Sequence, residues 1–106
     1  MASTVIGSTI VIDGEISGDE ALVVHGTVKG RIVLQERVEV APDGVVEATI
    51  AAPVVTVHGT VAGDISASER AELRAESQVI GDIRAPRILI ADGASFKGSV
   101  DMEVQG

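Results

Sequence analysis

Two stretches of this sequence share one pattern, Leu22-Val23-Val24-His25-Gly26-Thr27-Val28-Lys29-Gly30-Arg31-Ile32 and Val55-Thr56-Val57-His58-Gly59-Thr60-Val61-Ala62-Gly63-Asp64-Ile65. Each has alternating apolar residues, a short turn with glycine, and then the order apolar, any, glycine, any, apolar. The same frame fits four further segments, so that six copies cover nearly the whole chain. Their apolar and glycine positions are Ile10, Ile12, Gly14, Ile16 and Gly18; Val38, Val40, Gly44, Val46, Ala48 and Ile50; Ala71, Leu73, Val79, Gly81 and Ile83; and Ile88, Ile90, Gly93, Phe96, Gly98 and Val100.

Apolar residues recur at every second position within a copy, which is the period of a β-strand. A strand this short cannot bury its apolar side alone, but copies stacked about 4.8 Å apart form one continuous core. The second glycine of the frame, or its substitute, falls at positions 18, 30, 48, 63, 81 and 98, at intervals of 12, 18, 15, 18 and 17 residues. Most of these intervals suit a coil with three short faces. We therefore predict an all-β fold, a parallel β-helix (solenoid) of six short coils with three faces and a Val/Ile core.

The predicted solenoid is right-handed. Parallel crossover connections strongly favour the right-handed sense. Left-handed solenoids normally keep a strict six-residue repeat, and the intervals here do not keep that period.

The composition suits a narrow stack of coils. Of the 106 residues, 45% are hydrophobic but 1% are aromatic, and Phe96 is the single ring. β-Branched side chains favour extended backbone, and glycine turns tight corners without steric cost. The length allows one domain, for which we expect a core at residues 4–102 between tails at residues 1–3 and 103–106.

Composition and charge also exclude several classes of function. The absence of cysteine excludes disulfides and thiolate metal sites. The net charge of −8 argues against binding to a phosphate backbone, so no direct nucleic-acid partner is expected. No apolar run approaches the roughly 18 residues of a transmembrane helix, and Met1–Thr4 lacks the features of a signal peptide. We expect an acidic protein of the cytoplasm.

One segment contradicts the repeat locally. Residues 68–76 have the helix propensity of a Glu-, Arg- and Ala-rich sequence, with Ser66 or Ser68 as the N-cap. The repeat instead places Ala71 and Leu73 inward on a strand. Because a helix would interrupt the stack between two well-matched copies, we predict a strand.

The sequence offers no convincing catalytic, cofactor-binding or metal-binding residues. His25 and His58 precede glycine at the same corner of copies two coils apart, on the order of 10 Å from each other. That distance is too long for both to hold one metal ion at about 2 Å. The glycine-rich stretches lack the spacing of a phosphate-binding loop. We expect no enzyme activity, and we interpret the basic stretch Arg84–Arg87 as an inter-coil loop, with a docking patch as the alternative.

The two ends of the predicted solenoid lack the caps that keep such folds monomeric. The first coil, Ile10-Val11-Ile12, follows a short segment at residues 4–7, and the last coil ends at Val100. We therefore predict a homopolymer joined through both terminal coils, at Ile10, Ile12, Ile88, Ile90, Phe96 and Val100. Pairing of like ends would give a filament without polarity, whereas stacking of unlike ends would give a polar one.

Phe96 is the most informative single residue of this set. It takes the position that Ile16, Val28, Val46, Val61 and Val79 hold in the other copies. Nothing further in the chain stacks on that coil. Phe96 therefore either closes the open end of the core or meets another subunit, and the two roles are compatible.

Ala21–Gly30, Val57–Ile65 and Val79–Ile88 each combine apolar alternation with glycine at the turn or corner. Together these stretches resemble the bactofilin domain over about residues 4–102. The resemblance implies a right-handed β-helix that polymerises without nucleotide into non-polar bacterial cytoskeletal filaments. It also implies apolar terminal coils in the subunit contacts, with an aromatic residue in the last coil that matches Phe96.

The resemblance further implies scaffold roles in cell-shape control, for cell-wall enzymes or for chromosome-segregation proteins. Bactofilins usually carry disordered tails, often with an N-terminal membrane-targeting stretch. The tails are nearly absent here, so we expect contact with the inner face of the membrane only through a longer native N-terminal tail.

Two other functions remain as alternatives from the residues alone. A left-handed solenoid acyltransferase would place a catalytic histidine between the subunits of a trimer. The irregular copies and the duplicated corner at His25 and His58 speak against it. A solenoid face that binds carbohydrate usually uses exposed aromatic residues, which this chain lacks.

Overall fold

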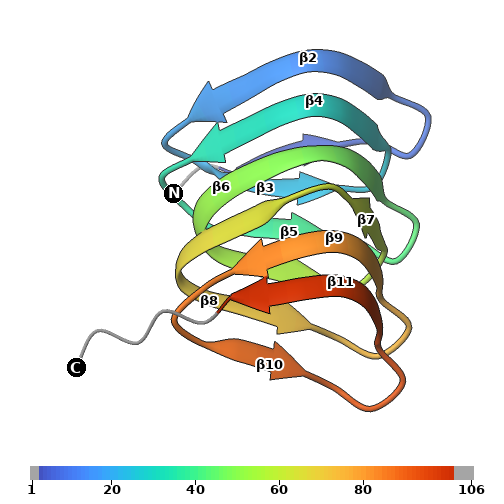
Figure 1. Cartoon of the computed structure of the whole chain (residues 1–106). Helices are drawn as coiled ribbons and strands as arrows, with labels where there is room; N and C mark the ends of the chain where they lie inside the picture. Colours follow the sequence, from blue (N-terminus) through green and yellow to red (C-terminus); the bar gives the residue numbers. More distant parts are fainter. Residues whose placement is uncertain (1–2, 102–106) are drawn as a thin grey trace.

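A computed structural model describes residues 3–101 as a solenoid of eleven β-strands (Figure 1). All the strand pairs are parallel and belong to one sheet. These residues contain no helix, and hence none long and apolar enough to cross a membrane. The strands are β1 (Ser3–Ile6), β2 (Val11–Gly18), β3 (Ala21–Val24), β4 (Thr27–Leu34), β5 (Val38–Val40), β6 (Val45–Val57), β7 (Thr60–Ala62), β8 (Ile65–Leu73), β9 (Gln78–Arg84), β10 (Ile88–Ile90) and β11 (Ser95–Asp101).

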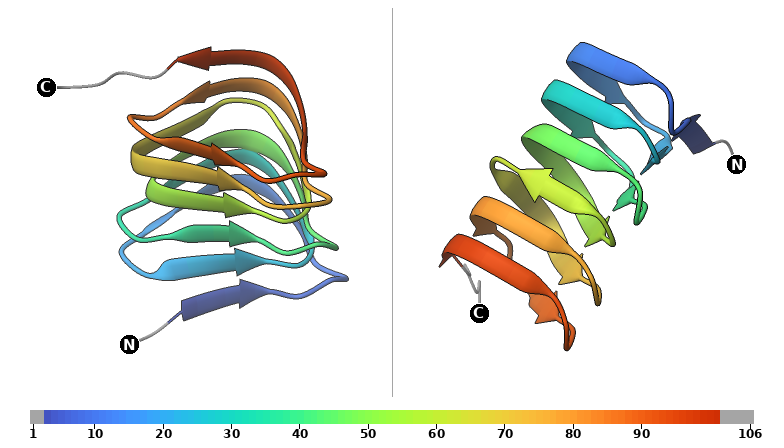
Figure 2. Two further views of the ribbon diagram at one scale, coloured as in Figure 1. Left: turned by 90° about the horizontal axis from the view of Figure 1, so that it is seen from below. Right: turned by 90° about the vertical axis from the view of Figure 1, so that its right-hand side faces the viewer.

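Each coil contains a short straight segment and a longer segment that bends midway (Figure 2). The short segments stack in the order β1, β3, β5, the end of β6, the end of β8 and β10. The longer segments stack in the order β2, β4, the start of β6, β7 with the start of β8, β9 and β11. The chain winds in the right-handed sense (Figures 1 and 2), which confirms the predicted β-helix.

The long segments bend at a column of small residues. The column consists of Gly14, Gly30, Ala48, Gly63, Gly81 and Gly98. Gly81 has a φ of +134°, and a Cβ added there would overlap the carbonyl oxygen of Gly63 in the coil before it. This corner therefore requires glycine both for its backbone conformation and for the close approach of successive coils. Ala48 turns the same corner without a positive φ.

The core consists of columns in which each coil contributes one inward side chain. In one column, Val28, Val46, Val61 and Val79 are all buried. A second column on the other side of the glycine corner is also buried, with Ile32, Ile50, Ile65 and Ile83. Stiff β-branched side chains at one repeated position pack with little loss of rotamer freedom. The prediction of a Val/Ile core is confirmed.

The glycine register predicted for the first coil is wrong. β2 pairs with β4 so that Gly14 faces Gly30, and Gly14 rather than Gly18 belongs to the corner column. The intervals between corner residues become 16, 18, 15, 18 and 17 residues. The frame failed here because glycine occurs at both 14 and 18, with an isoleucine two residues before each.

Two further details of the first coil differ from the prediction. Ile12 rather than Ile16 heads the column that ends in Phe96. Ile10 lies in the turn before β2, where its amide donates a hydrogen bond to the carbonyl of Gly7 (3.0 Å). The segment before this turn belongs to the first coil, because it forms β1 and pairs with β3.

The segment at residues 68–76 is not a helix. β8 extends through Leu73, and both Ala71 and Leu73 are buried in the column that the repeat predicts. Stacking on β6 and β10 outweighs the local helix propensity of this segment.

Candidate assembly interface

The N-terminal end of the solenoid is an open cross-section of the core. Within residues 3–101, β1 and β2 pair on one side, with β3 and β4 respectively. The inward side chains of Ile12 and Ile16 are half-buried, whereas Val28 and Ile32 in the next coil are fully buried. Ile10 is 47% exposed. An apolar surface of this kind favours burial against another surface.

The C-terminal end is open in the same way. β10 pairs with β8, and β11 pairs with β9, among the described strands. Ile88 and Phe96 are half-buried, and Ile90 is 53% exposed although Leu73, its neighbour in the preceding coil, is buried. Val100 is also exposed. The six residues predicted for subunit contact thus lie in two groups, Ile10 and Ile12 at one end and the other four at the opposite end.

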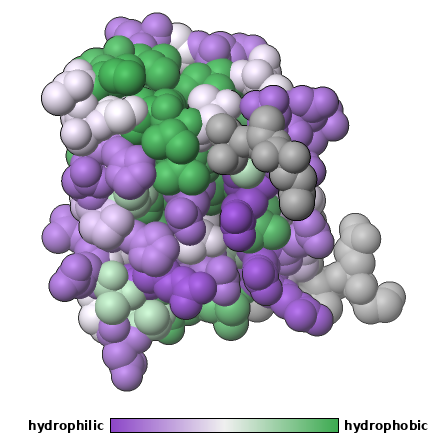
Figure 3. All heavy atoms as spheres, turned by 180° about the vertical axis from the view of Figure 1, so that it is seen from behind, coloured by the Kyte–Doolittle hydropathy of each residue, from purple (hydrophilic) through white to green (hydrophobic). Residues whose placement is uncertain are grey.

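Sequence reasoning missed apolar residues that point outward near the ends. Val5 and Leu89 belong to one outward column, in which the middle coils carry Glu39 and Glu72. Val11 at the start of β2 is 66% exposed. Figure 3 shows apolar side chains gathered over the first coils on the rear face of the solenoid. The likeness of residues 4–6 to residues 22–24 could have revealed β1 and its outward valine.

The two histidines lie in equivalent turns, and each is close to a carboxylate of the coil between them. His25 Nδ1 is 3.2 Å from Asp43 Oδ1, and His58 Nε2 is 3.9 Å from Glu39 Oε1. These side chains are about one-third to three-fifths exposed to solvent, where such pairs contribute little to stability. Residues 3–101 contain no group of three or more His, Asp or Glu side chains placed to hold a metal ion.

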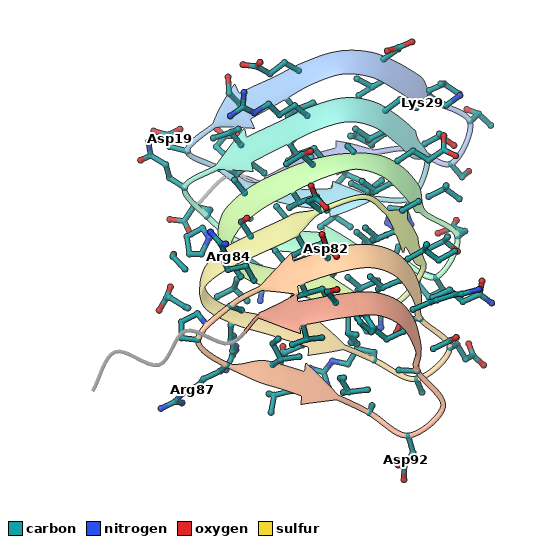
Figure 4. The ribbon with its side chains drawn as sticks, viewed as in Figure 1. Asp19, Lys29, Asp82, Arg84, Arg87 and Asp92 are labelled. Atoms are coloured by element: carbon teal, nitrogen blue, oxygen red, sulfur yellow. The ribbon has the colours of Figure 1, made fainter. Side chains whose placement is uncertain are left out.

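A groove of about 370 Å³ runs along the outward side of β8, β9 and β11. Its lining includes Ser66, Asp82, Arg84 and Ser99, and Figure 4 shows Asp82 and Arg84 projecting from β9. The lining contains neither histidine nor cysteine, so the serine hydroxyls there lack the adjacent imidazole of a hydrolase triad. Arg84 is the last residue of β9, and residues 85–87 form the expected inter-coil loop.

The two ends differ in charge. Every charged residue of the first coil is acidic, and the first lysine or arginine of the chain is Lys29 in the second coil. The first-coil carboxylates are Asp13, Glu15, Asp19 and Glu20. The last coil balances two basic and two acidic residues, Arg87, Lys97, Asp92 and Asp101. Figure 4 shows Asp19 at a corner of the first coil, and Arg87 and Asp92 at opposite corners of the last.

Comparison with known proteins establishes the family to which this solenoid belongs. The bactofilin family, described as polymer-forming and cytoskeletal, matches residues 4–101. The chain is a bactofilin. The resemblance inferred from the repeat is thereby confirmed over nearly the whole chain.

This bactofilin is similar to three bactofilins of Myxococcus xanthus (strain DK1622). BacO is 62% identical over 105 residues, which cover 99% of the chain and 83% of BacO. BacN is 57% identical over 101 residues, covering 95% of the chain and 89% of BacN. BacP is 49% identical over 100 residues, covering 94% of the chain and 42% of BacP. No solved structure shows significant similarity to the chain.

Membership in this family bears on the functional alternatives. Bactofilins are a cytoskeletal, polymer-forming family rather than a family of enzymes. The right-handed winding of this bactofilin also differs from that of a left-handed solenoid acyltransferase. The assignment of particular residues to subunit contacts stays a prediction.

Proposed function

We propose that this bactofilin assembles end to end, without nucleotide, into non-polar cytoplasmic filaments that serve as a scaffold. The family is polymer-forming. The observation that carries the end-to-end arrangement is the open core at both ends, where inward isoleucines and Phe96 are only half-buried. A second copy placed against either end would continue the stack of coils and bury these side chains.

The backbone at the two ends supports the same arrangement. A terminal strand that pairs on one side presents free N–H and C=O groups to any extended chain that approaches. β1 and β2 at one end, and β10 and β11 at the other, are such strands among those described. Contacts through terminal coils would satisfy these groups and join subunits along the solenoid axis.

In this proposal, client proteins of the scaffold would bind to the sides of the filament. Assembly through the ends would leave the outward faces of the inner coils free, and these carry polar pairs such as Lys29 with Glu47 (3.7 Å). Such faces would repeat along the filament and could hold client proteins of cell-shape control, cell-wall synthesis or chromosome segregation. Membrane contact belongs to this proposal only for a form with a longer N-terminal tail.

Assembly is expected to proceed without ATP or GTP. The glycines of this chain turn corners between strands, and their spacing does not form a phosphate-binding loop. Purified protein freed of nucleotide by enzymatic hydrolysis and dialysis should show filaments by negative-stain electron microscopy. Adding either nucleotide should leave their length distribution unchanged. Filaments that form only after nucleotide is added would contradict the proposal.

Filament growth is expected to increase with salt concentration, because the N-terminal ends that would pair are both acidic. In a non-polar filament, the four carboxylates of one first coil face the same four of another. Raising NaCl from about 20 mM to about 300 mM shortens the Debye length severalfold, so filaments should lengthen, as measured by dynamic light scattering and microscopy.

Neutralising two of these carboxylates, with Asp13→Asn and Glu15→Gln, should remove most of the salt dependence. The matched control, Glu36→Gln with Glu69→Gln, changes the net charge equally but at exposed positions of inner coils, and should retain it. Salt-independent growth of the unsubstituted protein would contradict pairing between N-terminal ends.

A further inference from the structure

Two residues of the first coil differ in size from their neighbours in the next coil. Ile10 is equivalent to Gly26 of the second coil. The carbonyl of Ile10 accepts a hydrogen bond from the amide of Thr27, and the carbonyl of Gly26 accepts the corresponding bond from Val45 in the third coil. Gly18 pairs with Leu34. Position 10 therefore carries a large side chain where the second coil has glycine. Position 18 carries no side chain where the second coil has leucine.

The fold does not require glycine at position 18. Its φ lies outside the left-handed region, unlike that of Gly30. A Cβ added to Gly18 would have its nearest contact at 3.8 Å, with Cδ2 of Leu34, which is an ordinary van der Waals distance. By contrast, a Cβ added to Gly26 would overlap the backbone of the first coil. Gly18 therefore leaves space that a side chain could fill.

That space is part of a hollow of about 190 Å³ at the N-terminal end. Leu22 and Leu34, both buried, form its apolar floor, and Ile16 lies beside them. At its rim, the Thr4 hydroxyl donates a hydrogen bond to Glu20 Oε2 (3.3 Å). An apolar cavity of about 150 Å³ can hold benzene, so this hollow has room for the four-carbon side chain of isoleucine.

A two-fold axis through the glycine corner would bring Ile10 and the hollow together. Seven inward or corner positions follow one another around the first coil: Thr4, Ile6, Ile10, Ile12, Gly14, Ile16 and Gly18. Ile10 and Gly18 each lie four residues from Gly14, on opposite sides of it. An axis through Gly14, perpendicular to the solenoid axis, therefore places Ile10 of one copy over Gly18 of a second copy, and the reverse.

We propose that the N-terminal ends of two copies pair about this axis, with the Ile10 side chain of each in the Gly18 hollow of the other. This proposal rests on the end-to-end assembly above and specifies the contact at one of its two ends. Such a contact is isologous, so the same two positions are used twice. It fills a hollow that would otherwise weaken the packing of the junction.

At the C-terminal end, too, one position has a larger side chain than in the preceding coils and another has a smaller one. Phe96 stands where four preceding coils have valine, and Val100 stands where they have isoleucine. A two-fold axis through Gly98 would exchange positions 96 and 100 between two copies. Phe96 of each copy would then meet Val100 of the other. Stacking of unlike ends would instead place Phe96 over Ile12 and leave Ile10 outside the Gly18 hollow.

Disulfide trapping tests the contact directly, because the native chain has no cysteine. The variants Ile10→Cys and Gly18→Cys are prepared separately, mixed, assembled and oxidised, so that any bridge between the two positions joins two chains. A disulfide needs Cβ atoms about 3.5–4.5 Å apart. We expect a covalent dimer from the mixture and much less from either variant alone.

A bridge between Ile10→Cys and Ala94→Cys, or filaments without any bridge between positions 10 and 18, would overturn the pairing and leave end-to-end assembly standing. Absence of filaments in the unsubstituted protein would contradict end-to-end assembly itself.

Filling the hollow provides a second test. Gly18→Leu should block the N-terminal contact and reduce filaments to dimers joined at their C-terminal ends, as measured by analytical ultracentrifugation. The circular dichroism spectrum should remain that of the unsubstituted protein, because the added side chain has room and favours a strand over glycine. The control Thr49→Leu adds the same side chain at an exposed position of an inner coil and should retain filaments. Normal filaments from Gly18→Leu would overturn the proposal.

Discussion

Replacing Phe96 with aspartate is expected to reduce filaments to pairs of subunits joined at their N-terminal ends. Phe96 is half-buried against the core of the last coil and is the single aromatic residue of the chain. A carboxylate there would have to lose its hydration against the apolar end of a second subunit, and an unpaired buried charge costs about 3–5 kcal/mol. That cost corresponds to a contact weakened by about 100-fold or more.

Analytical ultracentrifugation and negative-stain microscopy measure this effect directly. Phe96→Asp should sediment as a dimer, and its circular dichroism spectrum should remain that of a β protein because the side chain stands in the last coil. The control Phe96→Leu keeps an apolar side chain and should still form filaments. Unchanged filaments in Phe96→Asp would show that this residue closes the core without joining subunits.

Replacing Gly81 with alanine is expected to destabilise the solenoid strongly. Gly81 has a φ of +134°, and a Cβ there would overlap the carbonyl oxygen of Gly63. Backbone strain of this kind costs about 1–3 kcal/mol, and an overpacked interior a further 1–3 kcal/mol or so. The melting temperature should therefore fall by about 10 °C or more for a domain of this size.

Thermal unfolding should be followed by circular dichroism in the Phe96→Asp background, in which filaments are not expected to contribute to stability. Gln78→Ala is the matched control, since it places alanine at an exposed position of the same strand. It should melt within a few degrees of the parent. Equal melting temperatures for Gly81→Ala and the parent would contradict the requirement for glycine at the corner.

The inner coils could be predicted from the sequence almost completely. Alternation of apolar residues placed Val28, Val46, Val61 and Val79 in one buried column, and the structure has them there. The same frame gave the correct strand at Ala71, although local propensity favoured a helix. Inner coils are predictable because each one has a neighbour on both sides, and every neighbour repeats the same constraint.

The terminal coils were predicted less well, and the candidate interface depends on them. Ile12, Phe96 and Val100 were placed at the ends correctly, but β1 and the outward Val5 and Val11 were missed. The contact surface of a terminal coil has no partner coil within residues 3–101, so the repeat pattern does not constrain its outward residues. The Gly18 hollow likewise depends on which residues pair across coils and has no local signal.

The sequence by itself determined that this protein is a parallel solenoid with a Val/Ile core. The tertiary structure alone decided the register of the first coil. A strand that slips by one residue turns every side chain to the opposite face, but a slip of four residues leaves each side chain on its own face and the pattern unchanged. The pairing of β2 with β4 makes the choice between Gly14 and Gly18, because it places Gly14 beside Gly30, and Gly14 rather than Gly18 has the positive φ with which the chain turns this corner.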